Sequence, residues 1–278
     1  NTIIVNDGIY TEDLVIAKSD LTLRSVNGAA ATIISGQNGI AIDITNGADN
    51  FTLGGPGVGF TINGDAVNTL QLVRLSGATS GATIQGNSLD TSGTTEGAVS
   101  VGANGAVELT VYDNTFDLID TDDKAVELTG PVTPLVIDSN AITGPSDGNA
   151  ASILFTDGVA VDGAIISNNT ITHATSQIQL GAGIVTGITY SDNTFSQTAG
   201  AILVEEITED ATQVLSNLTV TRNTFSTSTL DSYAFMIDAT VEVEDVDYTT
   251  VAVINKNAFE IGDDGTNTFE VVSNDATG

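Results

Sequence analysis

Short alternations of apolar and polar residues recur along this chain, and each is followed by an asparagine. In residues 109–116, LTVYDNTF, the apolar Leu109 and Val111 are separated by one residue, and Phe116 follows Asn114 by two positions. An alternation with period two is typical of a β-strand that buries one face. The same pattern returns at 82–89, 135–142, 164–171, 188–195, 218–225 and 252–259.

The asparagines of these segments are spaced 27, 26, 29, 24, 30 and 34 residues apart: Asn87, Asn114, Asn140, Asn169, Asn193, Asn223 and Asn257. A strand-like repeat of this length predicts a solenoid, in which each copy is one coil stacked on the last. At about 4.8 Å per coil, the asparagines would form an internal ladder of hydrogen-bonded amides. Asparagine also tolerates the left-handed backbone conformation that a sharp turn needs.

A second set of apolar segments lies between the copies, at 40–44, 98–101, 125–129, 151–155, 177–180, 201–204 and 234–237. Each coil therefore carries at least two strands, with room for a third. Helical periodicity is almost absent, and Val, Ile and Thr dominate. We expect an all-β, single-stranded parallel β-solenoid of roughly eight to ten coils, forming one domain over residues 1–278.

The charge of the chain excludes several classes of partner. The chain contains six Lys and Arg residues and 36 Asp and Glu residues, which gives a formal net charge of −30. Nucleic acids and anionic membrane surfaces need a basic footprint, which this chain lacks. It has no cysteine and no apolar run long enough to span a membrane. Opening directly on a strand, it resembles a processed secreted protein, so we expect an extracellular, cell-surface location.

The first residues carry a more specific resemblance. Val5, Gly8, Tyr10, Glu12, Leu14, Ile16, Lys18 and Leu21–Leu23 form a V-x-x-G-x-Y-x-E-x-L-x-I-x-K-x-x-L-T-L run. This run resembles the first coils of right-handed parallel β-helix proteins of the pectate-lyase-like superfamily, in particular its NosD-like and surface-protein repeats. The resemblance implies the fold along nearly the whole chain. It implies no single function, because such repeats occur in lyases, hydrolases, adhesins and surface-layer proteins.

Basic residues that would serve catalysis are scarce. A β-helix lyase needs a base beside a uronate, and a hydrolase of the polygalacturonase kind needs aspartates with His, Arg and Lys. His173 is the one histidine, and we interpret it as a turn residue. Arg222 and Lys256 occupy equivalent positions in successive copies. Two neighbouring cations on an acidic chain are explained more simply by charge balance than by catalysis. We therefore predict no catalytic residues.

Carboxylates are too abundant to identify a metal site with precision. Asp120, Asp122 and Asp123 are weak candidates for Ca²⁺ ligands, as are Glu242, Glu244, Asp245 and Asp247. Neither group matches a known calcium loop. We expect no cofactor, and the sequence leaves open whether the chain binds calcium.

These observations favour a non-enzymatic, extracellular structural protein. No capping helix precedes Ile3 or follows Phe269, so open coil edges and lateral faces would assemble copies into a surface layer, sheath or filament. One alternative is a carbohydrate-active β-helix enzyme, a polysaccharide lyase or hydrolase, with polysaccharide as partner. The other is an adhesin stalk or binding module.

Overall fold

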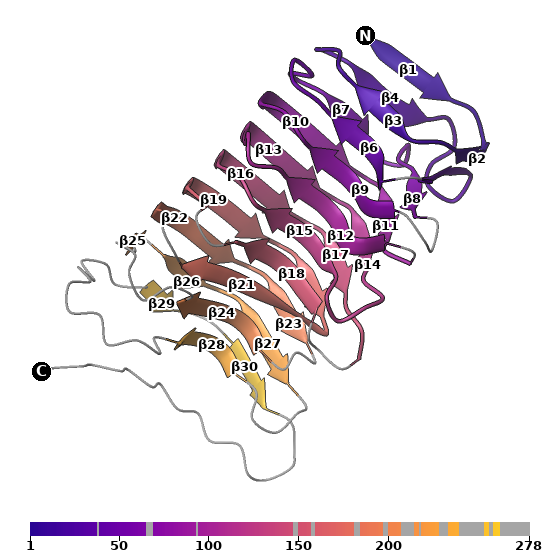
Figure 1. Cartoon of the computed structure of the whole chain (residues 1–278). Coiled ribbons are helices and arrows are strands. Elements are labelled where there is room, and N and C mark those ends of the chain that lie inside the picture. The colour runs from indigo at the N-terminus through magenta and orange to yellow at the C-terminus, as the bar shows by residue number, and fades with distance from the viewer. Residues whose placement is uncertain are drawn as a thin grey trace, which may run out of the picture.

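The chain winds into a parallel β-helix whose coils stack along one axis from the N-terminal end (Figure 1). The computed structural model describes residues 1–37, 39–64, 69–92, 94–146, 150–156, 159–180, 184–196, 200–206, 214–216, 218–227, 233–238, 253–255 and 258–261. This part of the chain consists of strands and connections, and it contains no helix with the length and hydrophobicity of a membrane span.

Each coil contributes one strand to each of three sheets. Sheet A contains β1 (Thr2–Val5), β4 (Thr22–Ser25), β7 (Thr52–Gly54), β10 (Thr79–Gln85), β13 (Ala106–Tyr112), β16 (Val132–Asp138), β19 (Val161–Ser167), β22 (Ile184–Ser191), β26 (Thr219–Thr221) and β29 (Val253–Asn255), with β25 (Val214–Ser216) also paired to β22.

Sheet B has short strands that follow the asparagine turn: β2 (Gly8–Thr11), β5 (Thr32–Ser35), β8 (Thr61–Asn63), β11 (Ser88–Asp90), β14 (Thr115–Asp117), β17 (Ala141–Thr143), β20 (Thr170–Thr172), β23 (Thr194–Ser196), β27 (Thr224–Thr227) and β30 (Ala258–Ile261). Sheet C closes the coil with β3 (Leu14–Ile16), β6 (Gly39–Ile44), β9 (Thr69–Leu75), β12 (Thr94–Val101), β15 (Lys124–Leu128), β18 (Ala150–Phe155), β21 (Ala174–Leu180), β24 (Gly200–Glu206) and β28 (Tyr233–Asp238).

These sheets confirm the predicted all-β solenoid and supply the third strand of each coil. Described strands number 11 in sheet A, 10 in sheet B and 9 in sheet C, in keeping with the expected eight to ten coils. Pairing joins each strand to its counterpart one coil away, and it is parallel, as for β13 with β16.

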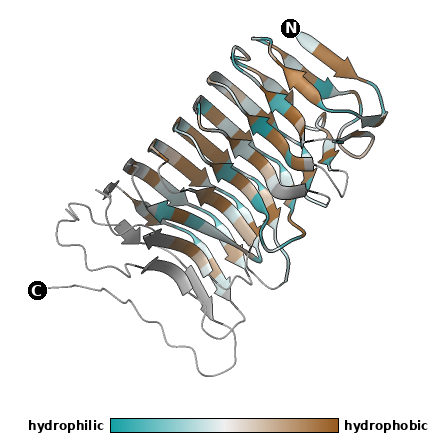
Figure 2. Ribbon diagram, viewed as in Figure 1, coloured by the Kyte–Doolittle hydropathy of each residue, from teal (hydrophilic) through white to brown (hydrophobic). Residues whose placement is uncertain are grey.

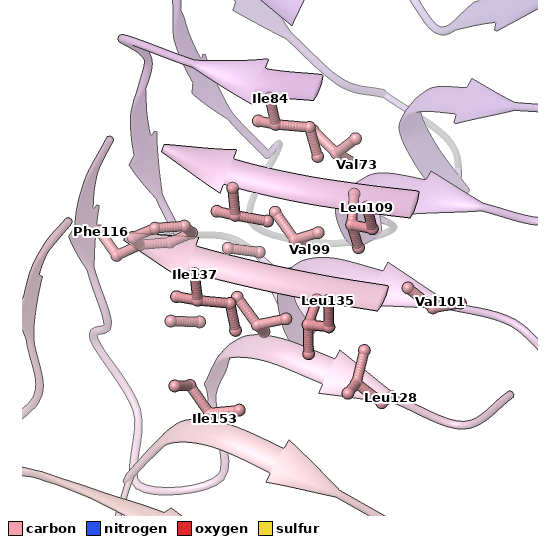
Figure 3. Close-up of a cluster of buried hydrophobic side chains, with 14 of the residues drawn as sticks. Val73, Ile84, Val99, Val101, Leu109, Phe116, Leu128, Leu135, Ile137 and Ile153 are labelled. Atoms are coloured by element: carbon pink, nitrogen blue, oxygen red, sulfur yellow. The ribbon is translucent and has the colours of Figure 1, made fainter. Parts of the chain in front are cut away.

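The core consists of aliphatic side chains stacked coil upon coil. On sheet A, Ile84, Val111 and Ile137 are register partners and fully buried. Sheet C faces them with residues such as Val99 and Ile153, and Phe116 of sheet B fills the corner (Figure 3). Apolar and polar residues alternate along the strands (Figure 2). Each buried aliphatic side chain contributes about 1.5 to 3 kcal/mol through removal from water, so every coil stabilises its neighbours.

Six of the repeated asparagines lie inside the turn between sheets A and B: Asn87, Asn114, Asn140, Asn169, Asn193 and Asn223, each at most 2 % exposed. The seventh, Asn257, lies outside the described residues. The side-chain oxygen of Asn140 accepts hydrogen bonds from both the backbone and the amide nitrogen of Asn114, at 3.0 and 3.1 Å. Its own amide nitrogen donates to Val111 O, Asp138 O and the side-chain oxygen of Asn169. The buried amide is therefore fully satisfied.

The left-handed residue of this turn is not the asparagine that we expected. It is the residue before it, with φ between 54° and 59° in five successive coils: Asp113, Ser139, Asn168, Asp192 and Arg222. The asparagine instead folds its side chain inward, where it replaces the backbone hydrogen bonds that the bend interrupts. The residue before it takes the left-handed conformation, and its side chain lies outside the core, so this position holds Asp, Ser, Asn or Arg in different coils.

One fully buried tyrosine interrupts the aliphatic columns. Tyr190 is the register partner of Ile166 and Val220, and its hydroxyl forms a 2.7 Å hydrogen bond with Ser176 of sheet C. Burial raises the pKa of the Tyr190 hydroxyl, so the side chain is neutral at physiological pH. This bond links sheets A and C across the core.

Replacing Asn140 with alanine tests the ladder. Asn140→Ala removes the acceptor of the buried Asn114 backbone N–H and the donor to Val111 O, so we expect a loss of about 1 to 3 kcal/mol in the free energy of unfolding, measured in urea. The exposed Asn46 is the matched control, and Asn46→Ala should change it by less than about 0.5 kcal/mol. Equal losses in the two variants would contradict the role of the ladder.

The Tyr190–Ser176 bond gives a second stability prediction. Tyr190→Phe and Ser176→Ala each leave one buried hydroxyl unpaired, so each should cost about 1 to 2 kcal/mol. The double variant removes both hydroxyls and should cost less than the sum of the single changes. Additive losses in thermal or urea unfolding would show that the bond contributes nothing.

Candidate active site

Between β8 and β27, the outward face of sheet B carries a column of polar residues, one from each coil. Register pairing places them in the order Asn63, Asp90, Asp117, Thr143, Thr172, Ser196 and Ser226. In all but two of these coils the residue is an amide or a hydroxyl. Asp90 and Asp117 are the exception, and they are neighbours.

Asp90 and Asp117 form a carboxylate pair on adjacent strands, β11 and β14. Partial burial raises the pKa of the Asp117 carboxyl, and the charge of Asp90 raises it further. Asp90 Oδ1 accepts a 2.8 Å hydrogen bond from the backbone of Ser92, which holds that oxygen in place. The pair therefore combines one carboxyl biased towards the protonated form with one that is anchored by a backbone donor.

We did not predict this pair from the sequence, although the spacing of the two aspartates in the repeat could have indicated it. Asp90 and Asp117 each follow a ladder asparagine by three positions, in the consecutive segments NSLD and NTFD. In a stacked repeat, equivalent positions of consecutive copies become neighbours, so two such aspartates must lie side by side. The abundance of other acidic residues hid this coincidence.

One of the predicted calcium candidates, Asp123, accepts hydrogen bonds within a turn. Asp123 is 2 % exposed, and its Oδ2 accepts hydrogen bonds from Thr91 Oγ1, Ile119 N and Asp120 N at 2.6, 3.1 and 2.9 Å. This carboxylate closes the turn after β14. Within the described ranges, no three His, Asp or Glu side chains, Asp120 and Asp122 included, gather as metal ligands. Glu242, Glu244, Asp245 and Asp247 lie outside those ranges, and calcium binding stays a prediction.

The basic residues that we considered for catalysis include an ion-paired arginine and a histidine in a turn. Arg222 forms a bidentate pair with Asp192, one coil away, at 2.7 and 2.6 Å. These hydrogen bonds lower the pKa of Asp192 and raise that of Arg222. His173 occupies a left-handed turn position with φ of 56°. Lys256 lies outside the described residues, so its pairing with Arg222 stays untested.

Comparison with known proteins identifies the fold. No family model and no curated protein matches this chain. An alginate lyase from Paenibacillus sp. str. FPU-7 superposes with a TM-score of 0.65 at 14 % identity, covering 94 % of this chain and 90 % of the lyase. A tailspike protein of E. coli bacteriophage HK620, solved with a pentasaccharide, superposes with a TM-score of 0.56 at 13 % identity over 94 % of this chain. The chain spans about half of the tailspike, 51 % of its length.

These structures confirm the right-handed parallel β-helix and correct the functional interpretation. The prediction that the chain is not an enzyme is wrong, because the same fold over nearly the same length serves in a polysaccharide lyase. The similar structures give no support to a surface layer or sheath either. Our prediction took the lack of clustered basic residues as a lack of chemistry, whereas stacking brings together residues that lie 27 positions apart, Asp90 and Asp117 among them. The chain thus shares the right-handed parallel β-helix fold of these two proteins.

Proposed function

We propose that this chain is an extracellular, carbohydrate-active β-helix that hydrolyses a glycosidic bond at Asp90 and Asp117. The pair itself carries the proposal: two register-paired carboxylates, one of them with a raised pKa. Glycoside hydrolysis needs a protonated carboxyl beside an ionised one, and environments that separate their two pKa values assign the roles. The alginate lyase and the pentasaccharide-bound tailspike support carbohydrate as the substrate class.

The spacing of the pair favours a mechanism with a covalent intermediate. The backbones of neighbouring strands lie about 4.8 Å apart, so paired side chains on one face start from a spacing close to the carboxyl separation of about 5 to 5.5 Å in retaining glycosidases. Asp117 would donate its proton to the glycosidic oxygen as the bond to the anomeric carbon breaks, while Asp90 bonds to that carbon. Asp117 would then take a proton from water, whose oxygen displaces Asp90 and releases the sugar.

The net charge favours a neutral polysaccharide as the substrate. A polyuronate carries one negative charge per sugar and would be repelled by a surface of net charge −30. Elimination from a uronate also needs cations around the substrate, whereas Arg74 and Arg222 are already paired with Asp43 and Asp192. The similarity to an alginate lyase nevertheless makes uronate elimination the second candidate.

The activity test compares three aspartates. Asp117→Asn and Asp90→Asn should each lower the rate of reducing-end release from a neutral polysaccharide panel by about 10²- to 10⁴-fold. Asp162→Asn, an exposed aspartate on sheet A, is the matched control and should keep full activity. Alginate and polygalacturonate are tested in parallel for unsaturated ends. Activity that survives in both pair variants, or only unsaturated products, would refute the proposal.

The same pair makes stability depend on pH. Because the pKa of Asp117 in the folded protein lies above 3.8, the native state binds more protons than the unfolded state just above that pH. The contribution of Asp117 to the stability of the wild type should therefore fall as pH rises through this window. Asp117→Asn removes the effect, so the variant should match wild type at pH 3 and exceed it slightly at pH 7, by less than about 1 kcal/mol because the side chain is exposed. A stability difference that does not change with pH would contradict this assignment.

A further inference from the structure

A pocket of about 300 Å³ lies at a different corner of the coils, where sheet C turns back into sheet A. It is formed by the corner segments of four successive coils, which contribute Asp49, Thr79, Ser80, Asn104, Pro131 and Thr133. Asp90 and Asp117 belong to sheet B, on the other side of each coil from this corner. The pocket is thus separate from the carboxylate pair.

Polar groups converge on this pocket. Asp49 Oδ1 accepts a 2.9 Å hydrogen bond from the backbone of Ser80, which fixes the carboxylate and leaves Oδ2 as an acceptor. The amide nitrogen of Asn104 donates to Ser76 O at 3.0 Å, which orients its oxygen as a second acceptor. The exposed Thr133 adds a hydroxyl that both donates and accepts.

One buried hydroxyl at the pocket lacks a partner. Thr79 lines the pocket and is 2 % exposed, and its Oγ1 forms no hydrogen bond in the described part of the chain. An unpaired buried hydroxyl destabilises the protein, and native structures rarely retain one without a reason. A ligand hydroxyl in the pocket would give Thr79 a partner after a rotation about its side-chain bond.

The chemistry of the lining selects the ligand. The lining contains one carboxylate and no basic side chain, so it would repel phosphates, sulfates and uronates. A single carboxylate is also too few ligands for a calcium ion. Ala78, Gly105 and Pro131 supply apolar surface next to these acceptors. Hydroxyl groups around an apolar ring face are the features of a neutral sugar, and the volume lies at the small end of ligand sites.

We propose that this pocket binds one neutral sugar unit and anchors polysaccharide away from the carboxylate pair. The inference rests on the proposed carbohydrate function, but it assigns a second site with no part in bond cleavage. Such a site raises the effective concentration of the polymer at the enzyme surface.

The test measures binding of glucose, galactose, mannose and N-acetylglucosamine by NMR titration of the whole chain. At least one sugar should bind with a Kd on the order of 1 mM, shifting the amide resonances of Ser80 and Gly105. Asn104→Ala and Thr133→Ala should each weaken binding about tenfold, as should Thr79→Val, without lowering the urea midpoint. Asn46→Ala, at the same corner but outside the lining, is the matched control and should bind as wild type does.

Two outcomes would overturn the pocket proposal: no sugar of the panel binding at roughly 50 mM, or affinity unchanged in all three lining variants. Hydrolysis of short soluble oligosaccharides separates this failure from failure of the catalytic proposal. Asn104→Ala should hydrolyse them as wild type does, and Asp117→Asn should bind the monosaccharide as wild type does. Loss of hydrolysis in Asn104→Ala with an intact fold would place both functions at one site and also overturn the separation proposed here.

Discussion

Stacking of equivalent residues at the spacing of neighbouring strands is the constraint on which this molecule depends. Between sheets A and B the backbone must bend, and the bend interrupts the hydrogen bonds that join one coil to the next. The buried asparagine amides restore them: the oxygen of Asn140 accepts two hydrogen bonds from Asn114, and its nitrogen donates to Asn169. A buried amide is stable only when its donors and acceptors are satisfied. Because each asparagine from Asn87 to Asn193 bonds to the next, the ladder keeps the coils from Asn87 to Asn223 in register.

Register then decides what the outer surface can do. Side chains that share a position in the repeat become neighbours, so chemistry in this fold arises between coils. Asp192 and Arg222 become an ion pair in this way, at 2.6 Å. Asp90 and Asp117 become a pair of like charge, which raises the pKa of Asp117. The first arrangement balances charge on an acidic surface. The second costs stability at neutral pH, and such a cost is typical of functional groups.

The acidity of the chain affects which polymers can approach these pairs. With a net charge of −30, the protein repels anionic polymers. From Thr143 to Ser226, the sheet B column consists of hydroxyl residues, and Thr172 and Ser196 share a 2.9 Å hydrogen bond. A neutral polysaccharide could lie along such a face without electrostatic repulsion. The same reasoning applies to the corner pocket, whose one carboxylate is held by the backbone of Ser80.

The amino-acid sequence by itself determined the solenoid, because its repeat specifies the apolar core along the chain and the asparagine ladder from Asn87 onward. Leu109, Asn114 and Phe116 could be assigned to the interior from local periodicity alone, and all three are buried. Local periodicity could not assign the left-handed residue to Asp113, since that depends on which side chain the turn draws inward. It also could not separate Asp90 and Asp117 from the other acidic residues, or Thr79 from the other threonines. Those distinctions come from the register between coils and from the packing of four corner segments, which only the tertiary structure decides.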